Sequence, residues 1–176
     1  MNNLPHKTQR VSFACALLFL FIFAIFLSGC GRKHTVERCY GVIPYASPEV
    51  EAQAKSFPPL TSDKPVIYII KKDEFTGAIP FYAWLDGVQV AMMSRGSFIM
   101  LPVESGEHTI SAHVGWKGLS EMHHSKKTSA LIECFPGRRY FLLMEADSGS
   151  ARLKQIPESE GIETVKLSDF IRTSIK

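Results

Sequence analysis

The stretch Ile79–Met93, which reads IPFYAWLDGVQVAMM, decides the fold class of this chain. Apolar side chains alternate in its first half, which puts Tyr82 and Trp84 on one face of a strand and the residues between them on the other. The Asp-Gly dipeptide in the middle is a strong signal for a two-residue β-hairpin turn. We expect Trp84 to lie in the core; the alternative is that it and Tyr82 mark a protein-binding face.

Turn signals recur from Lys64 onward, roughly every ten residues, in the pattern of an all-β sandwich or barrel. Val66–Lys71 is apolar on both faces and is expected at the centre of a sheet. The sequence predicts a mainly β fold, a single antiparallel β-sandwich of about seven to eight strands around one core. The candidate strands are Val66–Lys71, Ile79–Leu85, Val88–Met93, Ser97–Val103, Glu107–Trp116, Thr128–Phe135, Arg139–Ala146 and Ser150–Ile156.

Helical patterns flank the predicted strands. Ser47, Pro48 and Glu49 supply an N-cap, a proline at the first helical position and an acid in the first turn. A two-turn helix is therefore expected over Val50–Phe57 before the sandwich. Beyond Pro157 the apolar residues fit a short helix only loosely.

The N-terminus differs in composition from the rest of the chain. The first 29 residues hold two basic and no acidic side chains, and they include the apolar run Val11–Leu27, which is typical of an export signal. The remaining 147 residues carry 18 basic and 17 acidic side chains, whereas the whole chain has a net charge of +3. This near neutrality argues against nucleic-acid binding, and no second apolar run is long enough for a multispanning membrane protein.

The apolar run ends in Leu27-Ser28-Gly29-Cys30, which resembles the bacterial lipobox that lipoprotein signal peptidase recognises. The small Ser28 and Gly29 let the backbone enter a tight cleavage site, and the thiol of Cys30 can form a thioether to diacylglycerol. Proteins with this motif become acylated again on the new N-terminal amine, which anchors them to a membrane. Because Gly31 stands where aspartate favours the inner membrane, we expect the outer membrane, facing the periplasm. The alternative is an uncleaved N-terminal anchor.

These features divide the chain into four parts: a lipoprotein signal peptide (1–29), a lipidated N-terminus and tether (30–47), a β-sandwich domain (48–168) and a C-terminal tail (169–176). Cys15 would leave with the signal peptide and Cys30 would carry lipid, so Cys39 and Cys134 could form one disulfide in an oxidising compartment. The alternative is that Cys134 is a small core residue and Cys39 a free thiol.

The order of these motifs resembles an uncharacterised family of bacterial lipoprotein domains over roughly residues 48–168. The layout is also similar to the PEGA type of small β-sandwich found on bacterial surfaces. Related sequences carry Pro-Gly where this chain has Ser105-Gly106, which changes the stiffness of a turn more than the topology. The resemblance implies a β-sandwich on a lipid anchor and implies no activity. The matching motifs are Ala54-Lys55-Ser56-Phe57, Val66-Ile67-Tyr68-Ile69, Trp84-Leu85-Asp86-Gly87, Ser97-Phe98, Ser105-Gly106-Glu107-His108-Thr109-Ile110 and Gly137-Arg138-Arg139-Tyr140-Phe141.

The strong catalytic and nucleotide-binding motifs, such as G-x-S-x-G and H-E-x-x-H, are absent from the sequence, so we expect no catalytic residues, cofactor or metal. His108 and His113 are five apart on one predicted strand, point to opposite faces and cannot share a metal. His113 could instead join His123 and His124 around zinc or copper, although a solvated loop is the expected state of that segment.

Two further constellations are weak. The acids Asp73 with Glu74, and Glu145 with Asp147, stand at strand ends; acid/base catalysis would need them to face one substrate, and we expect polar loop tips instead. A cationic patch that engages lipid phosphates or an anionic wall polymer would form if a loop and a turn lie at the same end of the sandwich. Its members would be Lys117, Lys126, Lys127, Arg138 and Arg139.

The sequence as a whole predicts a non-enzymatic interaction module in the cell envelope, held at the membrane by lipid on Cys30. Its expected partner is an envelope protein or polymer, and nucleic acid is not expected. The competing function is an envelope enzyme or metal-handling protein that uses loop residues at one end of the sandwich. A third is pairing of an edge strand with another chain, most simply a second copy.

Overall fold

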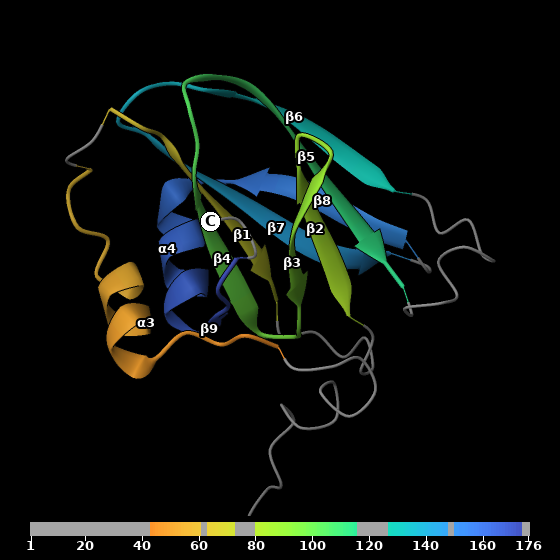
Figure 1. The fold of residues 1–176 in the computed structure, drawn as a ribbon, viewed down its shortest axis with the longest axis horizontal. Coiled ribbons are helices and arrows are strands. Elements are labelled where there is room, and N and C mark those ends of the chain that lie inside the picture. The colour runs from red at the N-terminus through yellow and green to blue at the C-terminus, as the bar shows by residue number, and fades with distance from the viewer. Residues whose placement is uncertain (1–42, 61–62, 73–79, 116–126, 148–149, 174–176) are drawn as a thin grey trace, which may run out of the picture. The chain divides into compact units, whose positions relative to one another are not determined.

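The computed structural model describes residues 43–60, 63–72, 80–115, 127–147 and 150–173 of the 176-residue chain. They form two packed β-sheets and two short helices, as Figure 1 shows. All eight predicted strands are present, with ends shifted by at most two residues, and the mainly β sandwich is confirmed. In chain order the elements are α3 (Pro48–Lys55), β1 (Val66–Lys71), β2 (Phe81–Leu85), β3 (Val88–Met93), β4 (Ser97–Pro102), β5 (Gly106–Val114), β6 (Thr128–Cys134), β7 (Arg139–Asp147), β8 (Ser150–Ile156), α4 (Glu158–Lys166) and β9 (Asp169–Phe170).

The prediction that the sandwich is wholly antiparallel is wrong. One sheet has four antiparallel strands in the order β3-β2-β5-β6, but the other is mixed, with five strands in the order β8-β7-β1-β4-β9. In the mixed sheet β1 runs parallel to β7, from Val66 opposite Arg139 to Lys71 opposite Met144, and β4 runs parallel to β9. Hairpin signals report only on strands that follow one another in sequence, whereas these pairs are distant in the chain.

The main core lies between the two sheets. Ile67 and Ile69 of β1 point into it and meet the inward side chains of β2, β5 and β7, such as Phe81, Ile110 and Leu142. All six residues of β1 are buried, which confirms the prediction that this strand is central. The hairpin after β2 is also confirmed: Asp86 and Gly87 both have positive φ, at 49° and 83°, as a type I′ turn requires.

A second core covers the outer face of the five-stranded sheet. Helices α3 and α4 lie over this face in Figure 1 and bury the alternate residues of its strands. The ring of Tyr68 stacks on Phe141 with centroids 4.8 Å apart, and Phe98 stacks on Phe170 at 4.9 Å. Gly161 lets α4 approach the sheet, because a Cβ at this position would lie only 2.2 Å from the ring of Phe141.

The two ends of the described chain meet beside β4. Ile43 is buried in the main core, and Tyr45 forms an isolated antiparallel bridge with Ile171. The N–H of Ala46 donates to the carbonyl of Phe170. Strand β9 was not predicted, and residues 43–46, expected to belong to the tether, form part of the folded unit.

The two ends of the sandwich differ, and we name them here. The tether end, along the lower edge of Figure 1, holds the β3–β4 turn at residues 94–96, the start of α3, the end of α4 and β9. Tyr45 belongs to it, because its hydroxyl shares a 2.7 Å hydrogen bond with that of Ser94. The turn end holds the short connections β2–β3, β4–β5 and β6–β7.

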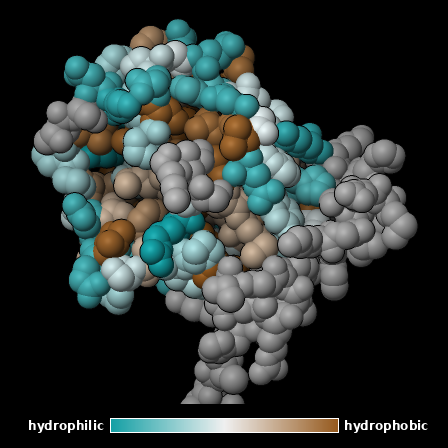
Figure 2. All heavy atoms as spheres, viewed as in Figure 1, coloured by the Kyte–Doolittle hydropathy of each residue, from teal (hydrophilic) through white to brown (hydrophobic). Residues whose placement is uncertain are grey.

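The surface in this view is apolar in its middle and hydrophilic along its upper and left margins (Figure 2). None of the helices in the described residues combines the length and the apolar character needed to cross a membrane.

Candidate functional site

The turn end contains a polar link between the β2–β3 hairpin and strand β5. One carboxylate oxygen of Asp86, Oδ2, lies 2.7 Å from Nδ1 of His108, and the other accepts the backbone N–H of Thr109 at 2.8 Å. The backbone N–H of Asp86 donates in turn to the carbonyl of Thr109 at 2.9 Å. Nε2 of His108 lies 2.8 Å from the carbonyl oxygen of Glu104. Three segments, at residues 86, 104 and 108–109, are therefore fastened together.

The partners of His108 favour its charged form. A carboxylate and a carbonyl can only accept hydrogen bonds, so both contacts form fully only when both ring nitrogens carry protons. Desolvation alone would lower the pKa of His108, but the hydrogen bonds to Asp86 and Glu104 outweigh it and raise the pKa. Desolvation would likewise raise the pKa of Asp86, and the bonds from His108 and Thr109 hold it below its ordinary value. This link was not predicted from the sequence. Two features indicated it: Asp86 stands in the predicted turn, and His108 stands on the core-facing side of its predicted strand.

The outer face of the four-stranded sheet carries an aromatic and basic cluster. Tyr82 and Trp84 of β2 both lie near the ring of His113, with centroids 6.4 and 6.3 Å away. The ammonium of Lys127 sits 4.7 Å from the centroid of the Trp84 ring. Burial, and to a lesser extent the charge of Lys127, lower the pKa of His113. The expectation that Trp84 lies in the core is wrong: it is half-buried on the outer face, because the inward positions of β2 are those of Phe81 and Ala83.

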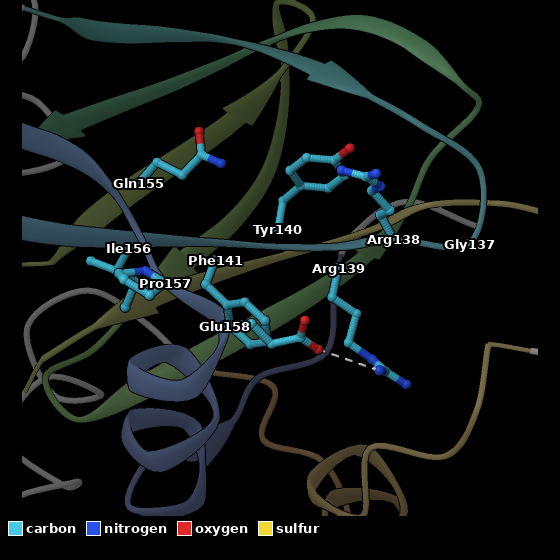
Figure 3. Close-up of a pocket in the computed structure, with 9 residues that line it drawn as sticks. All are labelled: Gly137, Arg138, Arg139, Tyr140, Phe141, Gln155, Ile156, Pro157 and Glu158. Atoms are coloured by element: carbon cyan, nitrogen blue, oxygen red, sulfur yellow. Dashed lines mark ion pairs between the residues drawn. The ribbon is translucent and has the colours of Figure 1, made fainter.

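A hollow of about 450 Å³ lies beside the start of β7, where the pairing with β8 begins only at Phe141 and Ile156 (Figure 3). Arg139 points to the helix side of the sheet and donates to the carbonyls of Phe57 and Pro58. Its Nη1 also lies 3.6 Å from the carboxylate of Glu158. The guanidinium is thus engaged in holding α4 and the segment after α3 together.

The structure does not bring together the predicted cationic patch. Lys127 precedes β6 and the Arg138–Arg139 pair follows it, so the seven-residue strand separates them by roughly 20 Å. Arg138 and Arg139 also lie on opposite sides of β7 in Figure 3. The guanidinium of Arg138 lies 5.7 Å from the ring of Phe135. Lys117 and Lys126 are outside the described residues, so no patch that joins Lys127 with these arginines forms.

Lysine 71 is an unexpected member of the main core. It ends β1 on the same side as Ile67 and Ile69 and is completely buried. Its ammonium lies 4.5 Å from the centroid of the Phe81 ring and donates to the carbonyl of Lys72 at 3.3 Å. A fully buried lysine is rare among proteins. Lys71 alternates with Ile67 and Ile69 along β1, and this is the one feature of the sequence that indicates an inward position.

The histidines and acids lie apart as far as the structure describes them. His108 and His113 are on opposite faces of β5, as predicted, since His108 bonds to the β2–β3 turn and His113 packs beside Tyr82. Among the described residues no three His, Cys, Asp or Glu side chains are grouped so as to hold a metal ion. Glu145 stands opposite Arg152 in the β7–β8 register. His123, His124, Asp73 and Glu74 lie outside the described residues.

The lipobox residues Leu27, Ser28, Gly29 and Cys30 also lie outside the described residues, as does Cys39. Cys134 is buried in the main core, and burial and then the charge of Asp86 raise the pKa of its thiol. The disulfide between Cys39 and Cys134 stays a prediction. Comparison of the chain with protein-family models and with curated proteins finds no match.

Proposed function

We propose that this chain is a bacterial envelope lipoprotein, anchored by lipid on Cys30, whose β-sandwich acts as a non-enzymatic interaction module. The observation that carries the proposal is the Leu27-Ser28-Gly29-Cys30 motif at the end of a long apolar run. The resemblance to an uncharacterised family of lipoprotein domains supports the lipid anchor, and the mainly β sandwich agrees with the fold that this resemblance implies. The outer membrane, facing the periplasm, is the proposed location because Gly31 follows the cysteine.

The fold supports a short tether between the lipid and the domain. Ile43 is the first described residue and is already buried, and the thirteen residues before it begin with Cys30. Thirteen residues span at most about 45 Å when fully extended, and about 20 Å on average as a flexible chain. A domain held this close meets a membrane-bound protein or polymer as if the contact were intramolecular. The tether thereby converts a weak contact into a stable one.

Three polar side chains of the described residues are engaged in contacts within the domain. The carboxylate of Asp86 engages an imidazole, the guanidinium of Arg139 engages carbonyls, and the ammonium of Lys127 covers an indole ring. Each of these contacts fixes a turn or strand relative to its neighbour. An envelope enzyme or metal-handling protein is the alternative, and it would draw on the connecting segments that carry Asp73, Glu74, His123 and His124.

The anchor is tested by replacing Cys30 with alanine in the full-length precursor. We expect the Cys30→Ala variant to remain unprocessed and to take up no labelled fatty acid. The Cys15→Ala variant is the matched control, because it removes a thiol from the same leader and should be processed and labelled normally. Normal processing and labelling of Cys30→Ala would overturn the proposal.

The binding role is tested by crosslinking in living cells. Proteins and polymers recovered with the lipidated protein are compared with those recovered with a form exported by a cleavable signal that leaves no lipid. We expect partner recovery to fall at least tenfold without the lipid, because the local concentration of the domain at the membrane falls. Equal recovery would show that the anchor does not act in binding.

A further inference from the structure

Exposed apolar side chains stand at both ends of the sandwich, Val88 and Phe135 at the turn end and Leu167 and Val50 at the tether end, and Leu167 is the most exposed of the four. Leu167, directly after α4, is 89% exposed, which is unusual for a large apolar side chain. It is fixed at the tether end, because the N–H of Asp169, two residues later, donates to the carbonyl of Gly96 in the β3–β4 turn. Val50 in the first turns of α3 is also exposed. Apolar side chains that project from this end suit contact with an apolar or amphipathic surface.

Basic side chains accompany Leu167 at the tether end. Lys166 precedes it, Arg95 lies in the β3–β4 turn, and Lys72 follows the end of β1. Acids are present here too: Glu163 pairs with Lys166 at 2.9 Å, Glu49 lies in the first turn of α3, and Asp169 begins β9. The end therefore offers exposed apolar groups with both basic and acidic groups around them.

The turn end is more strongly acidic. Glu104, Glu107 and Glu133 are exposed near the β4–β5 and β6–β7 connections, and Glu158 and Glu160 are exposed at the start of α4. Lys64, Arg138 and Arg139 are basic neighbours on that side; Lys64 is paired with Glu104, and Arg139 lies beside Glu158. A surface rich in carboxylates is repelled by lipid phosphates, whereas lysine and arginine near such a surface are attracted.

The position of the tether adds an independent constraint. The described chain begins at the tether end, where the hydroxyls of Tyr45 and Ser94 are bonded, and the thirteen residues before Ile43 lead to Cys30. A flexible chain of that length would reach about 20 Å on average, which is similar to the length of one six-residue strand. A lipid on Cys30 would therefore be attached to the domain at this end and not at the turn end.

We propose that the tether end is a membrane-docking surface, in which Leu167 enters the headgroup region of the bilayer and Lys166, Arg95 and Lys72 face lipid phosphates. This inference rests on the lipid anchor of the proposed function. It leaves the acidic turn end directed away from the membrane and open to a partner.

The test measures which end of the lipidated protein, produced from its full-length precursor, lies at the bilayer. Glu49 and Glu160 are exposed helical residues at opposite ends of the same layer, so Glu49→Cys and Glu160→Cys make a matched pair for a thiol-linked fluorophore. Cys39 is replaced by serine, and Cys134 is protected by burial. The proteins are reconstituted in vesicles of phosphatidylcholine and phosphatidylglycerol that contain a headgroup-level quencher lipid.

We expect quenching at least threefold stronger for the label at position 49 than for the label at position 160. Leu167→Asp should reduce quenching at position 49 by half or more, whereas Val88→Asp, an exposed apolar residue of the turn end, should leave it unchanged. Equal quenching at the two positions, or stronger quenching at position 160, would overturn the docking surface. Failure of the anchor is seen separately, because protein without lipid does not float with the vesicles.

A charge-reversal pair tests the basic side chains. Lys166→Glu should weaken quenching at position 49 on vesicles with phosphatidylglycerol and have a smaller effect on vesicles of phosphatidylcholine alone. Lys64→Glu, at the turn end, should have no effect on either. Both lysines are about half exposed and each pairs with one glutamate, so the two substitutions are matched in exposure and in the ion pair they remove. Equal effects of the two reversals would contradict the role of Lys166.

Discussion

Asp86 and His108, on different strands, meet at 2.7 Å, and the carboxylate of Asp86 also accepts the backbone N–H of Thr109. The side chain of Asp86 is 47% exposed, so solvent screens the pair and its contribution to stability is about 1 kcal/mol at most. Its value to the protein is positional, since it fastens a two-residue turn to the neighbouring strand.

The raised pKa of His108 and the lowered pKa of Asp86 predict how stability depends on pH. The contribution of His108 is complete below the pKa of the unfolded histidine, about 6.5, and is lost as the pH rises through the higher folded value. The contribution of Asp86 is complete above its unfolded pKa, about 3.8, and is lost as the pH falls through the lower folded value. The pair is therefore most stabilising between about pH 4 and 6.5.

Replacement of His108 by glutamine should remove this contribution. We expect His108→Gln to lose about 0.5–1 kcal/mol more stability at pH 5.5 than at pH 8.5, measured by urea unfolding. The lowered pKa of His113 changes stability in the opposite direction, so the quantity to compare is variant minus parent at each pH. A difference that is the same at both pH values would contradict the raised pKa of His108.

The close packing of Gly161 against Phe141 predicts that one added methyl group lowers the free energy of unfolding. Alanine favours a helix over glycine by about 1 kcal/mol, but its Cβ would lie 2.2–2.6 Å from three atoms of the Phe141 side chain. Overpacking of this kind costs about 1–3 kcal/mol or more, so we expect Gly161→Ala to be destabilising in thermal and urea unfolding. Ser159→Ala, at an exposed position of the same helix, should be neutral. Restoration of stability by Phe141→Leu in the Gly161→Ala background would identify the clash as the cause.

The contacts of Arg139 predict that it contributes more to the free energy of unfolding than its neighbour Arg138. Its side chain is 15% exposed and donates to the carbonyls of Phe57 and Pro58, and hydrogen bonds to charged groups contribute about 1.5–3 kcal/mol. We expect Arg139→Ala to lower the free energy of unfolding by about 2 kcal/mol and to speed proteolysis after α3. Arg138→Ala removes a contact with an exposed ring and should change stability by less than about 0.5 kcal/mol. Equal losses for the two variants would show that the carbonyl contacts are unimportant.

Cys134 predicts a thiol that reacts only after unfolding. It is buried in the main core with a raised pKa, so a bulky thiol reagent should not modify it in the native protein. When the protein is first reduced, then freed of reductant and unfolded in urea, Cys134 should react fully. The same reaction without any reductant reports on pairing with Cys39: both thiols react if they are free, and neither reacts if they are bridged. Rapid modification of native Cys134 would contradict its position between the sheets.

Local patterns in the sequence were sufficient to predict the strands but not their arrangement. Alternation in β2 and the Asp-Gly turn depend on neighbouring residues, and both were predicted correctly. The parallel pairing of β1 with β7 depends on Val66 meeting Arg139, more than seventy residues away, and no local rule specifies it. Strand β9 has two residues, too few for a period to show. Trp84 was misplaced because its size suggested the core while its parity, opposite to Phe81, indicated the outer face.

The contacts of the candidate site could also be predicted only where they depend on residues that are neighbours in sequence. The parity of β5 predicted that His108 and His113 face apart, but it could not show that Asp86 would meet His108, because that contact needs the hairpin to fold back beside β5. The prediction that Lys127 and the arginines share one cationic patch is wrong for a similar reason. Lys127 and Arg138 are close in sequence, and the strand between them carries them to opposite ends.

The bridge between Tyr45 and Ile171 also affects how the domain is made. These two residues stand near the two ends of the described domain, so a nascent chain cannot complete the sandwich until Ile171 has been synthesised. Contacts between residues this far apart in sequence slow folding, because a large loop must close before the contacts form. A chain with these features stays unfolded for longer while it emerges, and a truncation before Asp169 leaves β4 as an unprotected edge.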